Sequence, residues 1–501
     1  MKKNLIKKIL LAIFILMCST FIFGSLFVKK LFPDVAFEEL YFYLTNGVES
    51  SDNSLFILGL KNCLILIIIS SIIIYFIIDK MYITNIILKK KKNLLKIFKI
   101  IYLSFFLILS LYILAHNLNF FKYLNDQNSI SELIEKRYVD PKKVDVKFPL
   151  KKNLIMIYVE SLETSLFTKE QGGYWDYSVI GELYDLLNDS DSTVFYQSNK
   201  AQSMEMLDTS AWTTASVVAN SSGLPFKIPI KRNSYHSSNF MDGAYTLGDL
   251  LKDNGYYNEL ISSARTSFGG IKEYFKRHGN FKIIDINSYA NFDLQITKDD
   301  MCKWGFNDKF LFDSAKKRLN VIKNMDKPFN LVLQTIDTHY VDGYIGNYSV
   351  NKYDTRYENV YATESKLIVN FINWVKKQDF YKDTTIVIVG DHLSMQTSYF
   401  ESRGANKRYV YNCYINSAIE KSNTSNRIYT ALDTYPTVLS SIGAIVDGDR
   451  LGLGTNLFSD KKTLAEEYGF DKLNKELNKK SVFYNKKILK KDYDDMIKEK
   501  S

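Results

Sequence analysis

Three apolar runs lie within the first 120 residues of the chain, and they constrain its fold more than any other feature. The first run, residues 9–28, holds no charged residue over 20 positions. That is about the length that a helix rising roughly 1.5 Å per residue needs to cross a hydrocarbon core of roughly 30 Å. Residues 62–78 and 97–115 are two further candidates. We therefore predict a membrane region over residues 1–125 with three transmembrane helices.

Lysines flank these runs unevenly. Four lie before the first run, and six lie between residues 80 and 96, in the loop between the second and third runs. Positive residues collect on the cytoplasmic side of a membrane, so three spans place everything after about residue 117 outside the cytoplasm. A signal peptide would share the basic N-terminus, but the first run is long and lacks a small-x-small cleavage site. We predict a multi-pass protein of the cell membrane whose bulk is extracytoplasmic.

The net charge of +10 comes partly from the lysines beside the apolar runs and in the C-terminal tail. Such lysines face anionic lipid headgroups, which disfavours a nucleic-acid partner. Residues 31–55, between the first two runs, are predicted to form either an ordinary loop or a short interfacial helix on the outer leaflet.

The remainder of the chain has the pattern of an α/β protein. After a charged linker at 126–150, short apolar runs at 153–159, 330–336 and 384–389 alternate with amphipathic segments such as 245–254 and 364–378. Continuous apolar runs are typical of parallel strands buried on both faces. We predict a mainly parallel sheet flanked by helices over residues 151–460. The lysine-rich tail at 461–501 is predicted to be polar helix or disorder.

Polar residues follow each predicted strand: Glu160 after the first, His339 after the second, and Asp391 with His392 after the third. Ligands of open α/β sheets bind at the carboxyl ends of the strands, so these side chains should share one pocket. Each has a bland explanation as a cap or a turn, but the chain has only five histidines and two of them follow apolar strands. Carboxylate and imidazole donors without thiolate favour manganese, zinc or magnesium.

Seven motifs are familiar in this order: NLIMIYVESLE (153–163), SAWTTASVVANSSGLP (210–225), LGDLLKDNGY (247–256), WGFND (304–308), TIDTHYVDGY (335–344), IVIVGDHLSM (386–395) and LGLGTNLFS (451–459). With them the chain resembles the membrane phosphoglycerol transferases of the alkaline phosphatase (sulfatase) superfamily. That group contains lipoteichoic acid synthase and the phosphoglycerol transferase of periplasmic glucans, and the match to the glucan branch is stronger.

The resemblance implies that Glu160, Asp391 and His392 bind a catalytic metal, typically Mn²⁺, and that His339 contacts the phosphate. It also implies a hydroxyl nucleophile that shares the metal. The family's threonine position is filled here by Ser210, with Thr209 and Thr213 as alternatives in other registers. Two further residues are predicted to bind substrate, and these are Arg265 and Trp304.

The implied reaction moves phosphoglycerol from phosphatidylglycerol, through a covalent intermediate, to a glycan or polymer of the cell envelope. The chain has no Cys-x-Pro-x-Arg sequence, which disfavours sulfatase chemistry. Two alternatives stay open: a phosphoethanolamine transferase or phosphodiesterase on the same fold, and an inactive membrane protein that binds an envelope polymer.

Overall fold

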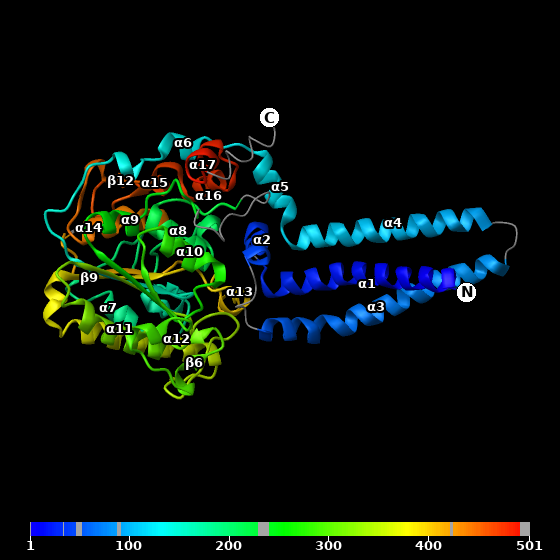
Figure 1. The fold of residues 1–501 in the computed structure, drawn as a ribbon, viewed down its shortest axis with the longest axis horizontal. Helices are drawn as coiled ribbons and strands as arrows, with labels where there is room; N and C mark the ends of the chain where they lie inside the picture. The colour runs from blue at the N-terminus through cyan, green and yellow to red at the C-terminus, as the bar shows by residue number, and fades with distance from the viewer. Residues whose placement is uncertain are drawn as a thin grey trace. The chain divides into compact units, whose positions relative to one another are not determined.

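The structure, a computed structural model, describes residues 2–33, 35–46, 53–87, 92–228, 240–420 and 424–490. The chain divides into two compact units (Figure 1). One comprises Met1–Leu40 and Asp52–Asn125, and the other comprises Tyr41–Ser51 and Asp126–Ser501. We call the first the membrane unit and the second the catalytic unit.

The membrane unit is built from three long helices, α1 (Lys2–Leu31), α3 (Asn53–Ile87) and α4 (Lys92–Asn117). Within them Leu5–Leu31, Ile57–Ile78 and Ile97–Asn117 are each long and apolar enough to cross a membrane. The three predicted spans fall inside these segments. Of the lysines used to predict orientation, those at 89–91 lie outside the described residues, and the orientation stays a prediction.

The catalytic unit is organised around a sheet of seven strands in the order β3-β10-β9-β2-β8-β4-β5. The strands β9, β2, β8, β4 and β5 run parallel to one another. At one edge β10 pairs antiparallel with β9, and β3 pairs antiparallel with β10. The bounds of the strands are Asn153–Val159 (β2), Ser192–Thr193 (β3), Tyr257–Ser262 (β4), Lys282–Ile284 (β5), Phe329–Gln334 (β8), Thr384–Gly390 (β9) and Asn412–Ile415 (β10). The three predicted strands are confirmed as β2, β8 and β9, which lie side by side.

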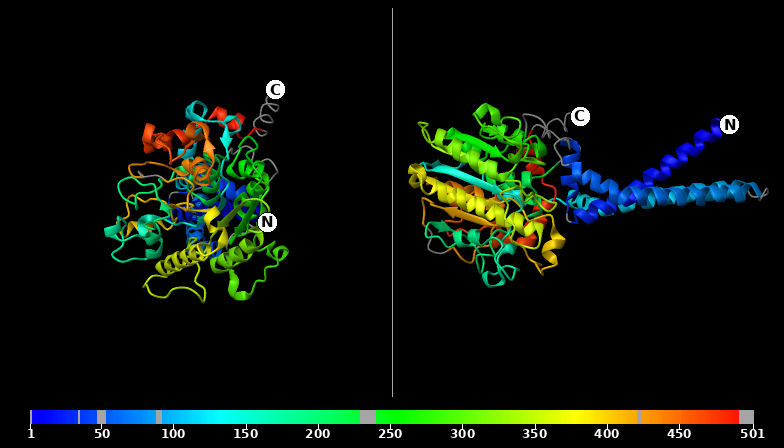
Figure 2. Two further views of the ribbon diagram at one scale, coloured as in Figure 1. Left: turned by 90° about the vertical axis from the view of Figure 1, so that its left-hand side faces the viewer. Right: turned by 90° about the horizontal axis from the view of Figure 1, so that it is seen from below.

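Helices cover both faces of this sheet (Figures 1 and 2). Alternate residues of β2 point to opposite faces, so Leu154 and Met156 join one core and Ile155 and Ile157 join the other. The first core contains α8 (Thr213–Ser222), α9 (Leu247–Asp253), α10 (Ile271–Arg277) and α14 (Thr434–Ser441). The second contains α7 (Gly181–Leu186), α11 (Asp308–Ile322) and α12 (Arg356–Val375). This is the predicted α/β architecture.

Two of these helices differ in length from the prediction. Helix α9 begins after Thr246, whose hydroxyl accepts the N–H of Asp249 in a capping box, so the first two predicted residues lie outside it. Helix α12 begins eight residues before the predicted start, because Thr355 caps it by accepting the N–H of Glu358.

The predicted linker and tail both pack onto the catalytic unit. The segment after the membrane unit forms α6 (Leu133–Arg137) and β1 (Val146–Lys147), and β1 pairs with β11 (Ile445–Val446). The tail forms α15 (Leu464–Tyr468), α16 (Phe470–Asn478) and α17 (Val482–Lys487), with Leu473 and Leu477 buried in the first core. The predicted boundary at residue 460 therefore needs correction: the fold continues at least to α17. Residues 491–501 of the tail lie outside the described residues.

The remaining elements are short or connect the units. They are α2 (Phe37–Asn46), α5 (Phe120–Asn128), α13 (Thr397–Glu401), the pair β6 (Met301–Cys302) and β7 (Gly305–Phe306), and the pair β12 (Arg450–Leu451) and β13 (Gly454–Thr455). The four cysteines are buried and unpaired, so Cys302 and Cys413 form no disulfide.

Candidate active site

The carboxyl ends of the three central strands carry the candidate site. Glu160 directly follows β2, and Asp391 with His392 directly follows β9. Because β2 and β9 are adjacent and parallel, with Val159 opposite Gly390, the two chain ends deliver these side chains to one point. This register brings together three of the four side chains that the sequence analysis expected to share a pocket, Glu160, Asp391 and His392.

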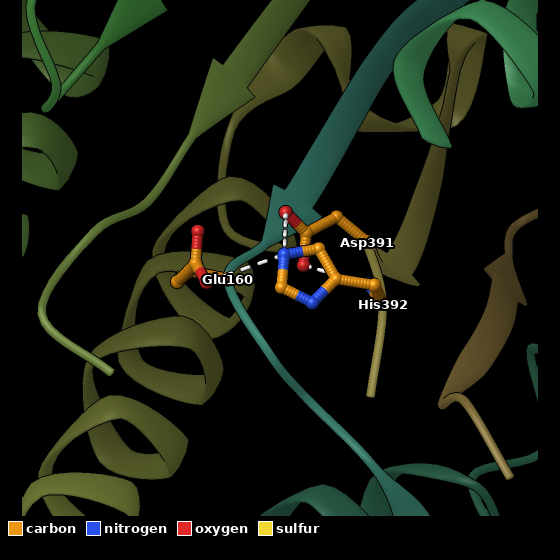
Figure 3. Close-up of side chains that lie close together, drawn as sticks. All are labelled: Glu160, Asp391 and His392. Carbon is orange, nitrogen blue, oxygen red and sulfur yellow. Dashed lines mark hydrogen bonds and ion pairs between the residues drawn. The ribbon is translucent and has the colours of Figure 1, made fainter. Parts of the chain in front are cut away.

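Glu160, Asp391 and His392 form a compact buried group, which we call the candidate metal site (Figure 3). One ligand atom from each lies within 4.8 Å of those of the other two. Nε2 of His392 lies 3.5 Å from a carboxylate oxygen of Glu160 and 3.5 Å from one of Asp391. All three residues are at most 3% exposed. Two carboxylates and one imidazole thus face a single point that is shielded from water.

The tautomer of His392 follows from the hydrogen bond that its Nδ1 makes. Nδ1 lies 2.9 Å from the carbonyl oxygen of Leu393, which can only accept, so Nδ1 carries the proton of the neutral ring. Nε2 then presents a lone pair toward the carboxylates of Glu160 and Asp391. Burial, and next the charge of Glu160, raise the pKa of Asp391 to about 7. A lone pair and two crowded carboxylates are satisfied together by a divalent cation, so the donor set fits a metal.

Backbone groups hold the two carboxylates in place. The N–H groups of Ser161 and His392 both donate to Oδ1 of Asp391 over 2.7 Å. The hydroxyl of Ser161 donates to Oε1 of Glu160 over 2.7 Å, and the N–H of Glu160 donates to Oγ1 of Thr335 over 3.0 Å. These hydrogen bonds orient the carboxylates before any ligand arrives, as metal sites require.

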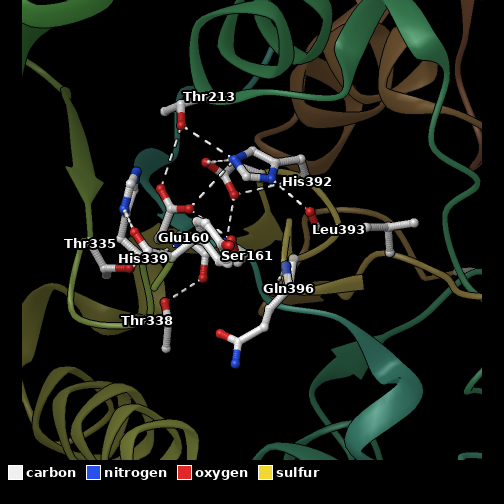
Figure 4. Close-up of polar contacts among 12 residues, drawn as sticks. Glu160, Ser161, Thr213, Thr335, Thr338, His339, His392, Leu393 and Gln396 are labelled. Atoms are coloured by element: carbon white, nitrogen blue, oxygen red, sulfur yellow. Dashed lines mark hydrogen bonds and ion pairs between the residues drawn. The ribbon is translucent and has the colours of Figure 1, made fainter. Parts of the chain in front are cut away.

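Of the three candidate nucleophiles from the sequence, Thr213 is the one whose hydroxyl contacts this group (Figure 4). Its Oγ1 lies 3.4 Å from Oε2 of Glu160 and 3.4 Å from Nε2 of His392. Thr213 is also the first residue of α8, whose N-terminal N–H groups carry partial positive charge. A negative charge that develops on this oxygen is therefore stabilised by the N-terminus of α8.

Ser210 is not brought to the candidate metal site. Its hydroxyl donates to the carbonyl oxygen of Leu207 over 3.2 Å, inside the 3-10 turn Asp208–Ser210. Thr209 lies in the same turn, and its buried hydroxyl has no hydrogen-bond partner among the described residues. Of the three candidates from the sequence, the geometry thus favours Thr213 over Ser210 and Thr209.

His339 lies on the other side of the site, in the loop after β8. Its Nδ1 is 2.6 Å from the carbonyl oxygen of Tyr340 and therefore carries the ring proton, which leaves Nε2 as an acceptor. The pKa of His339 is lowered to about 4, mainly by burial, with smaller contributions in the same direction from His392 and Lys303. The Trp304 ring packs against the imidazole with centroids 4.9 Å apart.

Arg265 is partly exposed, and its guanidinium donates to the carbonyl oxygen of Lys303 over 3.4 Å. The ammonium of Lys303 lies over the Trp304 ring, 4.2 Å from its centroid. Lys303, which the sequence prediction did not single out, is therefore the cation whose charge acts on His339. The only sequence signal for it was its position beside the WGFND motif.

Comparisons with known proteins agree with this fold. The sulfatase family model matches residues 209–444. Phosphoglycerol transferase I of Salmonella choleraesuis (strain SC-B67) is 29% identical over 329 residues, which are 64% of this chain and 40% of the relative, and that of Salmonella typhi is 29% identical over 342 residues. The chain thus spans less than half the length of the curated relatives it matches.

Two solved structures share the fold. One is an alkaline phosphatase superfamily protein from Vibrio parahaemolyticus, with a TM-score of 0.51, 20% identity, and coverage of 67% of this chain and 79% of the other. The second is the integral membrane lipooligosaccharide phosphoethanolamine transferase A of Neisseria meningitidis, with a TM-score of 0.51, 12% identity, and coverage of 87% and 84%. With three apolar helices before an alkaline phosphatase-like domain, the chain is a membrane protein of the sulfatase/alkaline phosphatase superfamily and a distant homologue of phosphoglycerol transferase I.

Proposed function

We propose that the protein transfers phosphoglycerol from phosphatidylglycerol, through an ester on Thr213, to a hydroxyl of a glycan or polymer of the cell envelope. The observation that carries the proposal is the convergence of the Thr213 hydroxyl with the two carboxylates and the imidazole of the candidate metal site. The similarity to phosphoglycerol transferase I supports the choice of donor. The three apolar helices would keep the enzyme where a lipid donor presents its headgroup.

Glu160, Asp391 and His392 would hold the metal, with Mn²⁺ as the first choice and Zn²⁺ or Mg²⁺ as alternatives. When bound, a divalent cation lowers the pKa of a nearby hydroxyl and neutralises charge on phosphoryl oxygens. The carboxylates are already fixed by the backbone N–H groups of Ser161 and His392. The chain therefore offers this metal a site that needs little rearrangement.

In the first step Oγ1 of Thr213 attacks the phosphorus of the donor. A bond forms between this oxygen and phosphorus while the bond from phosphorus to the diacylglycerol oxygen breaks. Thr213 loses its hydroxyl proton, and the departing oxygen gains one, so the step is balanced in protons. The N-terminus of α8 stabilises the negative charge as it passes through the transition state.

His339 is the residue we propose to carry that proton. Because Nδ1 is committed to the Tyr340 carbonyl, Nε2 is the atom that can take up a proton and give it to the departing oxygen. An anionic phosphate raises the pKa of a neighbouring imidazole, which counters the lowering by burial. In the second step an acceptor hydroxyl attacks the phosphorus of the threonine ester, and the bond to Thr213 breaks.

The proposal is tested with the full chain in mixed micelles that contain Mn²⁺ and phosphatidylglycerol with a fluorescent acyl chain. The expected result is metal-dependent release of fluorescent diacylglycerol. Thr213→Ala should lower the rate by about 10³-fold or more, because it removes the nucleophile, whereas Ser210→Ala should retain activity. Thr213→Ser keeps a hydroxyl and should retain part of the rate.

Three outcomes would change the assignment. Release from phosphatidylethanolamine and not from phosphatidylglycerol would move the protein to the phosphoethanolamine transferases. A rate that survives Thr213→Ala but is lost in Ser210→Ala would overturn the assignment of the nucleophile. Diacylglycerol release from phosphatidylglycerol that needs no acceptor hydroxyl other than water would mark a phosphodiesterase.

A further inference from the structure

Three aromatic side chains form a continuous surface beside the nucleophile, and we call them the aromatic lip: Tyr43, Trp212 and Phe268. The rings of Tyr43 and Phe268 stack with centroids 4.9 Å apart and planes inclined by 13°. The rings of Tyr43 and Trp212 meet edge-on with centroids 5.4 Å apart. Tyr43 and Phe268 are only half-buried, whereas Trp212 is 4% exposed.

The lip is joined to the reaction centre through the start of α8. Trp212 is the N-cap residue of this helix and directly precedes Thr213. The next residue, Thr214, donates its hydroxyl to the carbonyl oxygen of Gly269 over 2.7 Å. Phe268 is therefore held beside the start of α8, because its neighbour Gly269 accepts this hydrogen bond. The lip is thus connected directly to the residue that we propose as nucleophile.

Tyr43 reaches this place from outside the catalytic domain sequence. It lies in α2, between the apolar helices α1 and α3, yet residues 41–51 belong to the catalytic unit. The neighbouring Phe42 is fully buried, and its ring contacts Trp212 and Phe226 with centroid distances of 5.1 and 5.5 Å. Phe42 thus anchors the segment and presents Tyr43 at the surface. Leu44, the next residue, is 76% exposed.

The chemistry of this surface matches the apolar part of a lipid. Half-buried rings with an exposed leucine beside them bind methylene groups through the hydrophobic effect and dispersion. Aromatic faces also stack on sugars, but the exposed aliphatic side chain of Leu44 favours hydrocarbon. The segment is tied on both sides to helices that are long and apolar enough to span a membrane, where lipid is the available ligand.

We infer that the aromatic lip binds the glycerol ester and the first methylenes of the donor lipid, so that the phosphorus of the donor is positioned at Thr213. This inference rests on the proposed function, since it assigns the subsite for the diacylglycerol part of the same donor. Tyr43 and Leu44 are positioning residues that come from the membrane-connecting segment. The subsite predicts that a lipid donor is preferred over its deacylated headgroup.

A binding experiment tests the lip without turnover. All four tryptophans lie in the catalytic unit, so the fluorescence of the full chain reports that unit alone. The Thr213→Ala chain is mixed with micelles of phosphatidylglycerol brominated near the carboxyl ends of its acyl chains. Bromine quenches tryptophan at short range, and the part of the quenching that disappears on adding Trp212→Phe belongs to Trp212.

We expect quenching of Trp212 that weakens in Tyr43→Ala, with an apparent affinity lower by about 3- to 10-fold, the range for one lost aromatic contact. The matched control is Tyr177→Ala, because Tyr177 is 41% exposed and stacks on Tyr353 in a pair that includes no residue of the lip. This control should leave the quenching unchanged. Equal quenching with and without Trp212 overturns the inference.

A kinetic comparison adds the functional readout. Tyr43→Ala should raise KM for phosphatidylglycerol about 3- to 10-fold and leave the rate with deacylated glycerophosphoglycerol unchanged. An equal loss with both donors would overturn the inference, because Tyr43 would then act on the fold or the chemistry. Trp212 quenching by a lipid that is never turned over would refute the proposed function and keep the lip. No quenching by the brominated lipid, together with a change in Trp212 fluorescence on adding a soluble glucan, would reassign the lip to the acceptor and overturn the inference.

Discussion

Replacing Leu477 by alanine should destabilise the catalytic unit, although the residue lies in what the sequence presents as a lysine-rich tail. Leu473 and Leu477 are four residues apart on one face of α16 and are 1% and 0% exposed. Both pack into the core that also holds α8 and β2. Truncating a fully buried leucine costs about 2–5 kcal/mol. For a unit of this size that corresponds to a midpoint lowered by roughly 3–6 °C.

The same helix supports the segment that leads to the nucleophile. The side-chain amides of Asn474 and Asn478 each donate to a carboxylate oxygen of Asp208 over 2.9 Å. The N–H of Asp208 donates to Oδ1 of Asn474 over 2.9 Å. Asp208 begins the turn that precedes Thr213, so loss of α16 removes three hydrogen bonds from the approach to the site.

The measurement is thermal unfolding of the full chain in detergent, followed by tryptophan fluorescence, which reports the catalytic unit. Leu150→Ala is the matched control, because Leu150 belongs to the same unit and is 49% exposed. The free energy of unfolding of Leu150→Ala should differ from that of the wild type by no more than about 0.5 kcal/mol, as expected for a surface substitution. A chain ending at residue 460 should fail to fold. An unchanged midpoint for Leu477→Ala, or a stable chain ending at 460, would refute the assignment of α16 to the core.

Three further measurements test other parts of the structure. Glu259 is fully buried and accepts two hydrogen bonds from Arg318 at 2.9 and 2.8 Å. Glu259→Gln should therefore lower the free energy of unfolding by about 3–5 kcal/mol. The double variant that combines Glu259→Leu with Arg318→Met should recover most of this free energy. Burial raises the pKa of Asp433 to about 7 from 3.8. The contribution of the protonated Asp433 to stability is therefore lost as the pH rises from about 4 to about 7. Asp433→Asn should flatten that part of the curve of unfolding free energy against pH. Mn²⁺ at about 100 times its Kd should raise the free energy of unfolding by about 2.7 kcal/mol. Ser210→Ala should keep this stabilisation, whereas Asp391→Asn should abolish it. Equal stabilisation of both variants would contradict the candidate metal site.

The central strands could be predicted because their burial on both faces leaves a simple signal. Consecutive apolar residues form the middle of β2, β8 and β9, and a polar residue marks the point where each run reaches the ligand edge of the sheet. The short strands β4 and β10 carry no such mark. Asn258 and Asn412 lie within them, and both are buried, so a sequence pattern that expects apolar residues passes over them.

The packing of the tail onto the core was not predicted, and the reason is the opposite one. In α16 only Leu473 and Leu477 face the core, and the polar residues around them set the average composition. A helix that contributes two side chains to a core is amphipathic, and its apolar spacing of four residues, rather than its lysine content, carries the structural information. The interpretation as polar helix or disorder came from composition alone.

The proposed nucleophile shows where a motif and a structure give different kinds of information. Ser210, Thr209 and Thr213 lie within a stretch of five residues, and only the local backbone distinguishes them. The 3-10 turn commits Ser210 to the carbonyl of Leu207, whereas the start of α8 points Thr213 at Glu160 and His392. A hydroxyl at the first position of a helix gains the partial positive charge of the helix N-terminus. That rule could have ranked Thr213 first, because small residues from Thr213 to the closing Gly223 mark this helix in the sequence.

The aromatic lip follows from the same helix start, and it explains why a membrane-connecting segment is built into the catalytic unit. Trp212 occupies the N-cap position without making a side-chain cap, so its ring is available for Phe42 and Tyr43. A soluble phosphodiesterase would need no such contact, since its substrate arrives from water. An enzyme that takes its donor from a bilayer must bring the phosphorus of a lipid to Thr213, and an apolar surface beside that residue lowers the free energy of the lipid in the position from which it reacts.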